Sequence, residues 1–439
     1  MQEGLITVVD FGSKKLSASL GKETEIDVEI IGSESVLSKG GVRKGLIYDK
    51  DICKEALIEV IDKIEGKSNE RINDIYAGIS SNTLRLLEVE GSIDLSPKKI
   101  ELTDKKQVIE NARQNLLLED DEEIVDYLIN FYTLDGKIIE GDIIDYIGNI
   151  LEVNITYILG KTKELNKFKE IIYECGYNFK GFVVNIISGK NIFLYDKKTI
   201  GTNVIVDVGA EVTDIAIYNN GMLKYISSIP LGGESVTRDI SICGNCSIIE
   251  AESLKKMYSK NYESMYKKDY NNSLIELDNV KISKELFYEV IKARLEEIIK
   301  FVSRELKKSS FYDGICSIII YGDGIIGYEN INFIVKNEIK KKCKVISKDE
   351  LGMESLENIS SLSGVKEVYD KLKVLNDLKV LNDFKLFNDK DLVNEEEFNT
   401  QHNLINKDKD NSDEEFDYYY EEKKKHNGVM SKIKKFLKL

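Results

Sequence analysis

The stretch Val206–Gly221 reads VDVGAEVTDIAIYNNG, and it decides the fold class of this 439-residue chain. A short β-branched run ends in Asp207, Gly209 follows, and a second apolar alternation begins at Thr213. This pattern predicts a buried strand, a glycine-bearing turn and a second strand. The turn N–H groups of such a hairpin can point at phosphate oxygens, and glycine lets the backbone approach closely. Glu211, however, places a carboxylate where a phosphate would be expected.

The same pattern occurs once more, near the start of the chain. Residues 5–13 read LITVVDFGS, and the alternating run Leu16–Leu20 follows. Two such hairpins, separated by a domain's length, predict a duplicated α/β domain with a cleft between its halves. Asp10 and Asp207 could then hold a hydrated Mg²⁺, which keeps its waters and prefers few carboxylates. The alternative is that both aspartates merely cap strand ends.

Composition excludes several classes of protein. A chain of 439 residues with 42% hydrophobic residues predicts two or more domains with substantial cores. The net charge of −15 argues against a nucleic-acid partner, which would require a basic face. We expect no secretory signal and no membrane-spanning segment, because no apolar run reaches about 18 residues.

The six cysteines show no disulfide framework, which suits a reducing compartment. Cys243 and Cys246 form a single CxxC pair. Zinc requires four ligands, and the only histidines, His402 and His426, lie far away in a polar tail. We therefore interpret the pair as structural or incidental rather than as a metal site.

Between the two hairpins and beyond them, periodicity predicts helices at 51–65, 104–118, 163–175 and 251–308, the last broken near 259–273. Strands are expected at 72–80 and 318–321, the latter ending in Gly322 and Gly324. Residues 81–160 form a distinct block of helix and strands. Gly176 is expected to end the helix before it.

The character of the chain changes after about Asp370. A hexad repeats three times over residues 372–389, which we interpret as a sticky or partly ordered linker, and residues 391–425 are polar and mostly acidic. The last eleven residues form an amphipathic pattern with an apolar stripe of roughly 120° opposite lysines. A lysine-rich helix of this kind lies in the headgroup plane of an anionic membrane. The predicted membrane-binding residues are Val429, Met430, Lys432, Ile433, Lys434, Lys435, Phe436, Leu437 and Lys438.

Several motifs together resemble the actin/Hsp70/sugar-kinase superfamily. Residues 10–13 (DFGS) resemble its first phosphate loop, 207–214 (DVGAEVTD) its second, and 321–324 (YGDG) its adenosine-binding strand end. Within that superfamily the chain resembles the FtsA family of bacterial cell-division proteins, over residues 5 to 366. The segments that carry this resemblance are 41–49 (GVRKGLIYD), 75–80 (IYAGIS), 230–240 (PLGGESVTRDI) and 251–255 (AESLK). Their order and spacing are specific, although no single motif is.

The resemblance implies an α/β fold of the actin-like, duplicated ribonuclease H-like ATPase type with an inserted small α/β subdomain. A disordered linker and a C-terminal amphipathic helix follow. The implied divisions are 1–80 with 162–200 for subdomain 1A, 81–161 for the inserted SHS2-like subdomain 1C, 201–235 with 305–369 for subdomain 2A, 236–304 for subdomain 2B, 370–427 for the linker and 428–439 for the membrane-targeting helix.

The implied cofactor is ATP with Mg²⁺, the metal being held through water by Asp10 and Asp207. Arg294 and Glu297 lie, by position, near the implied contact with the C-terminal peptide of FtsZ. The alternative for this pair is a surface ion pair three residues apart, worth a few tenths of a kcal/mol. The implied ATP-binding residues are Asp10, Gly12, Ser13, Lys14, Asp207, Gly209, Thr213, Asp214, Gly232, Gly233, Glu252, Lys255, Gly322 and Gly324.

The second loop departs from the family's usual DxGGGTTD. Ala210, Glu211 and Val212 replace Gly, Gly and Thr. A carboxylate ~5 Å from a phosphate charge at an effective dielectric of ~20 would cost roughly 3 kcal/mol, more than a hundredfold in affinity. Either Lys14 or Lys15 offsets this repulsion, or the Glu211 side chain turns outward. We therefore expect weakened nucleotide binding and at most a weak ATPase, with no catalytic residue assigned.

The resemblance implies a scaffold that self-associates in an actin-like filament on the cytoplasmic face of the cell membrane at the division septum. Its implied partners are a second copy, the FtsZ peptide, anionic lipid and other division proteins. A PilM-like assembly protein is the first alternative, and it normally lacks the amphipathic tail. The second alternative is a small-molecule kinase, but no segment of the sequence indicates a catalytic base or a substrate pocket. A plasmid-segregating actin would lack both the tail and the insertion.

Overall fold

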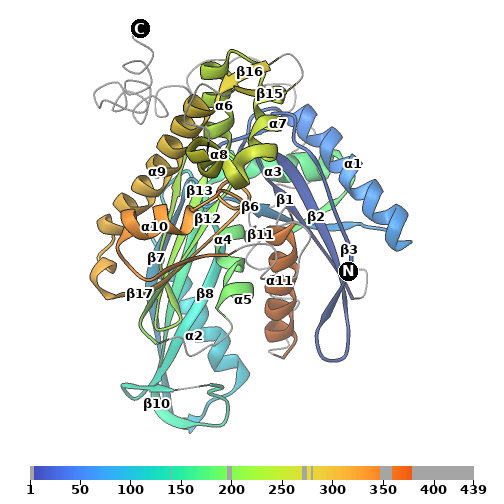
Figure 1. The fold of residues 1–439 in the computed structure, drawn as a ribbon. Coiled ribbons are helices and arrows are strands. Elements are labelled where there is room, and N and C mark those ends of the chain that lie inside the picture. Colours follow the sequence, from blue (N-terminus) through green and yellow to red (C-terminus); the bar gives the residue numbers. More distant parts are fainter. Residues whose placement is uncertain are drawn as a thin grey trace. The chain divides into compact units, whose positions relative to one another are not determined.

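The structure is a computed structural model, and it describes residues 4–139, 141–194, 200–268, 274–277, 280–346 and 358–377 (Figure 1). The chain divides into two units, Met1–Tyr369 and Asp370–Leu439. The described part of the second unit is the C-terminal end of helix α11 (Ile359–Asp377), which includes the first predicted hexad. The rest of the predicted linker, 378–427, and the amphipathic segment 428–439 lie outside the described residues.

Two five-stranded sheets carry the first unit, and they have the same topology. Their strand orders are β11-β6-β1-β2-β3 and β18-β17-β12-β13-β14. In each sheet the second strand in sequence is antiparallel to the first, and the fourth is parallel to it. The predicted duplication is therefore confirmed. The strands are β1 (Leu5–Phe11), β2 (Lys15–Glu23), β3 (Val28–Leu37), β6 (Asp74–Ile79), β11 (Asn178–Val184), β12 (Thr202–Val208), β13 (Thr213–Asn219), β14 (Met222–Ile229), β17 (Ile315–Tyr321) and β18 (Cys343–Val345).

The β-branched residues of β1 and β12 explain their central position, because both sheet faces are covered there. Val8 and Val9 of β1 and Val204 and Val206 of β12 are completely buried. Helices α1 (Lys50–Ser68) and α3 (Thr162–Glu174) pack on the first sheet and on each other. Both were predicted, and Gly176, with a φ of 85°, follows the end of α3 as expected.

The inserted block is a subdomain with its own core. A four-stranded antiparallel sheet in the order β7-β10-β8-β9 packs its buried face against α2, whose Val108 and Ala112 are completely buried. In Figure 1 the label β10 and helix α2 lie at the lower end of the view. The elements are β7 (Leu84–Lys99), α2 (Leu102–Gln114), β8 (Glu122–Leu134), β9 (Lys137–Ile139) and β10 (Ile147–Lys161).

A helical region is inserted between β14 and β17 of the second sheet. The predicted helices over 251–308 are present, and the break near 259–273 contains a helix and leads into a small hairpin. That hairpin was missed, although Ile275, Val280 and Ile282 are buried at alternating positions. The elements are α6 (Glu234–Gly244), α7 (Ile248–Tyr258), the 3₁₀ turn η1 (Ser259–Asn261), α8 (Tyr262–Lys268), β15 (Leu274–Leu277), β16 (Val280–Ser283) and α9 (Lys284–Lys308).

Helix α11 follows the second sheet in sequence but contacts the first half. The Ser361 hydroxyl lies 2.8 Å from that of Ser19 on β2, and Ser363 lies 2.8 Å from Ser188. The implied divisions place residues 305–369 with the second half, whereas these contacts join the start of α11 to the first. The remaining elements are β4 (Val42–Arg43), β5 (Leu46–Ile47), α4 (Asn185–Ser188), α5 (Lys190–Phe193), the 3₁₀ turn η2 (Tyr312–Gly314) and α10 (Ile331–Ile339).

Candidate functional site

Three acidic side chains meet where the two predicted hairpins end. Asp207 pairs in register with Asp214 across β12 and β13, while Asp10 occupies the equivalent position on β1. Burial raises the pKa of Asp10 to about 7, and the charge of Asp214 adds to that rise. Burial and the charges of Asp214 and Asp10 raise the pKa of Asp207 well above its ordinary value. The structure thus brings the two predicted aspartates together with a third.

Among the described residues, the groups that shift the pKa values of these three carboxyls are neutral or acidic. Asp214 is buried, yet its partners are neutral: Ser80 and Ser81 donate to its Oδ1 at 3.0 and 2.8 Å. Within the described residues, no three His, Cys, Asp or Glu side chains are arranged to coordinate one metal ion. Carboxylates are the protein ligands through which a hydrated Mg²⁺ is usually held, so these donors fit a cation bound through water.

Asn185 supplies a second sign that the cluster is incomplete. Its Nδ2 donates to Asp10 Oδ1 at 2.7 Å, which fixes the amide against the first loop. Its Oδ1 is buried and has no hydrogen-bond partner among the residues that the structure describes. A buried acceptor of this kind normally contacts a water or a ligand donor. Asn185 thus places an unsatisfied buried acceptor beside Asp10.

Glycines allow three loops of the second half to meet beside the cluster. The Gly233 N–H donates to Gly209 O at 3.0 Å, and the Gly324 N–H donates to Val208 O at 2.8 Å. A methyl group added at Gly232 or Gly324 would overlap the carbonyl of Gly209. The predicted glycines therefore lie together, and at least two of their N–H groups are engaged within the protein.

Two further residues of the predicted ATP site, Thr213 and Gly322, lie beside these three loops. Thr213 is buried, and its hydroxyl donates to Leu231 O at 2.7 Å, so it ties two loops together. Gly322 has a φ of 104°, a conformation that favours glycine, and it packs against Asp207 at the end of β17. On the first loop, the Ser13 hydroxyl accepts from the Gly45 N–H at 3.3 Å.

Lys14, Glu252 and Lys255, all predicted to contact ATP, form an ion-pair network across the halves. Glu252 pairs with Lys14 through one oxygen and with Lys255 at 2.6 Å through the other. The Thr237 hydroxyl donates to the latter oxygen at 2.6 Å. Burial opposes ionisation of Glu252, but the two lysines outweigh it, and its pKa falls to about 2. Lys14 therefore neutralises Glu252 in this structure.

Glu211 turns toward a different pair of groups. Its Oε2 accepts from the Lys44 N–H at 2.9 Å, and its Oε1 pairs with the Arg238 guanidinium. The prediction that the side chain could turn outward fits these contacts. The alternative was compensation by Lys14 or Lys15, and in this structure Lys14 pairs with Glu252. Sequence reasoning missed Arg238, since no local spacing connects α6 with the second loop.

Comparison with known proteins agrees with these features. A family model described as cell division protein FtsA matches residues 204–375. Cell division protein FtsA of Neisseria meningitidis serogroup B is 27% identical over 321 residues, which cover 71% of this chain and 75% of that protein. The Bacillus subtilis protein of the same name is 26% identical over 358 residues, 80% of each chain. This chain is therefore similar to cell division protein FtsA over most of its length.

Solved structures with an actin-like fold resemble the duplicated sheets. Among solved structures, the PilM-PilN type IV pilus biogenesis complex aligns with a TM-score of 0.57 and 12% identity, over 82% of this chain and 97% of that chain. At this identity the likeness concerns the fold alone. No helix in the described ranges is long and apolar enough to span a membrane.

The two residues implied for FtsZ contact, Arg294 and Glu297, are less exposed than the members of a surface ion pair would be. Arg294 is buried, and its Nε donates to Asp239 Oδ2 of α6 at 2.8 Å. It also pairs with Glu297 three residues away on α9. The alternative of a simple surface ion pair is therefore wrong. The arginine joins α9 to α6, and only its contact with Glu297 lies within one helix.

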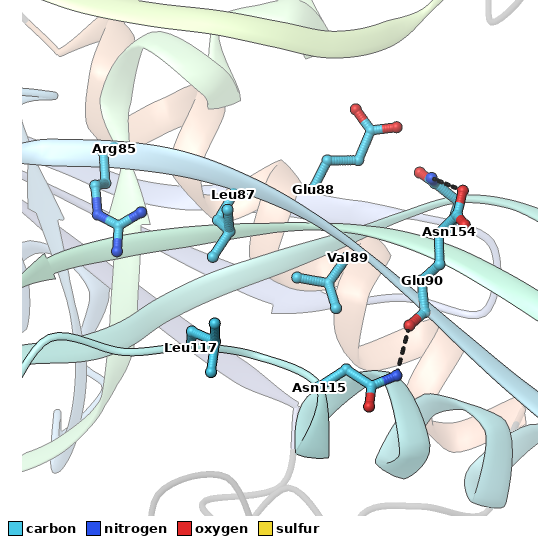
Figure 2. Close-up of a pocket in the computed structure, with 8 residues that line it drawn as sticks. All are labelled: Arg85, Leu87, Glu88, Val89, Glu90, Asn115, Leu117 and Asn154. Atoms are coloured by element: carbon cyan, nitrogen blue, oxygen red, sulfur yellow. Dashed lines mark hydrogen bonds between the residues drawn. The ribbon is translucent and has the colours of Figure 1, made fainter.

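A cavity lies on the inserted subdomain, between β7, β10 and the end of α2. It has a volume of about 670 Å³ and is lined by Arg85, Leu87, Glu88, Val89, Glu90, Asn115, Leu117 and Asn154. Figure 2 shows Leu87, Val89 and Leu117 facing one another, while Glu88 points away from them. Glu88 accepts instead from Lys224 of β14 at 2.7 Å. Sequence analysis singled out none of these residues, because they follow ordinary strand alternation.

Two predictions of the sequence remain to be placed. All six cysteines are free thiols in the structure, as the lack of a disulfide framework predicts. The predicted membrane-binding residues lie outside the described part of the chain: Val429, Met430, Lys432, Ile433, Lys434, Lys435, Phe436, Leu437 and Lys438.

Proposed function

We propose that this FtsA-family chain is an actin-like scaffold of cell division. It self-associates on the cytoplasmic face of the membrane at the septum, tethers the FtsZ ring and recruits later division proteins. The observation that carries the proposal is the inserted α2/four-stranded subdomain on a duplicated actin-like fold, in a chain whose relatives are named cell division proteins. Nothing in this role requires rapid nucleotide turnover.

Self-association is supported by apolar side chains at the far end of the inserted subdomain. Ile138, Tyr146, Ile147 and Ile150 are all among its exposed large hydrophobic residues. They come from β9 and from β10 with the turn before it. Clustered exposed apolar residues favour a contact with another protein surface. We assign this tip to a second copy of the chain.

Nucleotide binding is proposed between the halves, with Mg²⁺ held through water by Asp10 and Asp207. The cation would supply positive charge beside the buried carboxyl groups and would help to hold the phosphates. Asp10 and Asp207 would hold it through water, while Glu252 and Lys255 would face the nucleoside. We expect ATP to have a structural role and hydrolysis to be negligible.

Calorimetry with Mg-ATP tests this cofactor directly. We expect a dissociation constant above the micromolar range for the intact chain, with no heat for Asp207→Asn. Absence of heat from the intact chain at millimolar Mg-ATP would remove nucleotide from the proposal while leaving the scaffold role standing.

The FtsZ peptide is assigned to the helical region between β14 and β17, which corresponds to subdomain 2B. Ile242, Ile248 and Ile249 are exposed there on α6 and α7, and Ile249 is 79% exposed. Apolar side chains on a helical surface fit an amphipathic peptide. Glu297, on α9, remains assigned to this contact, whereas Arg294 contributes by holding α9 against α6.

Membrane attachment is assigned to residues 428–439 through their lysines and apolar stripe. Each lysine near an anionic leaflet contributes about 1 kcal/mol, and linked copies bind with a high effective concentration. Lys432→Glu with Lys435→Glu should release the chain from anionic vesicles. Unchanged co-sedimentation of this variant would contradict the anchor.

One alternative role keeps a specific basis in the fold. A PilM-like assembly protein has the similar architecture seen in the TM-score of 0.57. A small-molecule kinase is less well supported, because the sequence indicates neither a catalytic base nor a substrate pocket. Binding of an FtsZ C-terminal peptide to the purified chain separates the FtsA-like role from both alternatives.

A further inference from the structure

The turn between β4 and β5 has an unusual backbone. Arg43 pairs with Leu46, so Lys44 and Gly45 form a two-residue hairpin turn. Their φ angles are 50° and 78°. Both central positions of such a turn require positive φ, which suits Asn, Asp or Gly, whereas a lysine there costs about 1 kcal/mol. The surrounding contacts must therefore hold Lys44 in this conformation.

Three contacts fix this turn, each from a different loop. The Lys44 N–H donates to Glu211 of the second loop at 2.9 Å. Its carbonyl accepts from Asn82 Nδ2 at 2.9 Å, and the neighbouring Gly45 N–H donates to Ser13 of the first loop at 3.3 Å. Only the first of these contacts crosses from one duplicated half to the other.

The carboxylate of Glu211 is satisfied at both oxygens. Its second oxygen pairs with Arg238 on α6. The Glu211 side chain is 15% exposed and that of Arg238 is 52% exposed, so the pair lies at the rim with its acidic member largely covered. Charge-assisted hydrogen bonds to a partly desolvated carboxylate are stronger than neutral ones. A glycine at this position could make neither contact.

We propose that Glu211, the Lys44 backbone and Arg238 form a clasp that holds the first half against the second without any bound ligand. Glu211 thereby acts as an internal anion that the loop itself supplies. Other contacts across the halves have the same effect, among them those of Lys14 with Glu252 and of Ser81 with Asp214. The clasp goes beyond the proposed scaffold role, and it stands whether or not ATP binds.

Hydrogen–deuterium exchange of the ligand-free chain tests the clasp. We expect Glu211→Ala to speed exchange of the peptide covering residues 41–49 about tenfold, the effect of losing one charge-assisted hydrogen bond. Arg238→Gln should speed it at least threefold, because the carboxylate loses its second partner. In a chain that carries both substitutions, Arg238→Gln should speed exchange by less than a further twofold over Glu211→Ala alone, since both changes act on one contact.

Glu276→Gln is the matched control, because the ion pair of Glu276 with Lys281 stays within the β15–β16 hairpin. It should leave exchange at 41–49 unchanged. If Glu211→Ala fails to fold, as judged by lost protection in α1, Arg238→Gln alone decides. Exchange at 41–49 within twofold of the intact chain, or an undiminished Arg238→Gln effect in the double variant, overturns the clasp.

Discussion

At the scale of single residues, the buried carboxyl groups at the hairpin ends affect how the stability of the ligand-free chain depends on pH. Asp10 changes its charge within the ordinary pH range, because its pKa of about 7 lies far above the 3.8 of an exposed aspartate. Between these values the folded state binds a proton that the unfolded state has released. Stability therefore falls as pH rises from about 4 to 7 and is then constant with respect to this group.

Asp10→Asn should stabilise the ligand-free chain, because it removes a buried charge. The shift from 3.8 to about 7 corresponds to about 4 kcal/mol at pH 8, and to about 2 kcal/mol at pH 5. Denaturant melts at both pH values measure this difference. Asp62→Asn, at an exposed position of α1, is the control and should change little. A gain for Asp10→Asn that does not shrink at pH 5 would be incompatible with the burial of its charge.

Glu211 affects nucleotide affinity less than its sequence position suggests. Because Arg238 and the Lys44 N–H neutralise its carboxylate, Glu211→Gly should tighten Mg-ATP binding by about tenfold rather than a hundredfold. Calorimetry on both chains measures the ratio. A gain of a hundredfold or more would mean that the carboxylate faces the phosphates unshielded.

At the scale of elements, α6 and α9 are joined by a buried ion pair. Arg294→Ala would leave Asp239 buried without its cation, at a cost of about 3–5 kcal/mol. Glu297→Gln, which keeps the Asp239 contact, should cost below about 1 kcal/mol. Chemical denaturation of both variants measures these losses. Equal losses would show that the contact with Asp239 does not stabilise the helical region.

The tip of the inserted subdomain offers a second test at this scale. Ile147→Lys with Ile150→Lys should abolish self-association, since both side chains are exposed and charge repels a second copy. The melting temperature should change little. Sedimentation velocity measures the assembly state, with Ile26→Lys, exposed on the loop between β2 and β3, as the matched control. Undiminished assembly would exclude the tip as the contact.

Elements that carry a local pattern were predictable from the sequence. The two hairpins follow from β-branched runs that end in Asp-x-Gly, and α1 and α3 follow from their apolar spacing. The β15–β16 hairpin was missed because it occupies only short runs of four residues each within a helical region. The return of α11 to the first sheet was not predicted, because its contacts combine serine hydroxyls with the close approach of Gly364 and Val365 to distant strands.

Some residues of the candidate site could likewise be predicted from the local sequence, and others could not. The aspartates and glycines were found because they sit at fixed offsets from strand ends. The ion pairs of Lys14 with Glu252 and of Glu211 with Arg238 join residues 238 and 27 positions apart. No periodicity spans such distances, so only the folded chain reveals these partners.

At the scale of the whole molecule, the proposed scaffold must connect three surfaces on one chain. In the proposal, the inserted subdomain would contact a second copy, the helical region the FtsZ peptide, and the C-terminal residues lipid. Linked contacts of this kind raise the effective concentration of each partner, so moderate affinities suffice. A weak nucleotide site is compatible with such a scaffold, because the clasp and the ion pairs already hold the halves together.

Recruitment of FtsZ to anionic vesicles by the purified chain tests the central claim most directly. The account predicts that FtsZ co-sediments with vesicles only when this chain is present, and that deleting the C-terminal peptide of FtsZ abolishes the effect. Lys432→Glu with Lys435→Glu should leave FtsZ and the chain together in the supernatant. FtsZ that stays in the supernatant although the intact chain pellets with the vesicles would contradict the scaffold role.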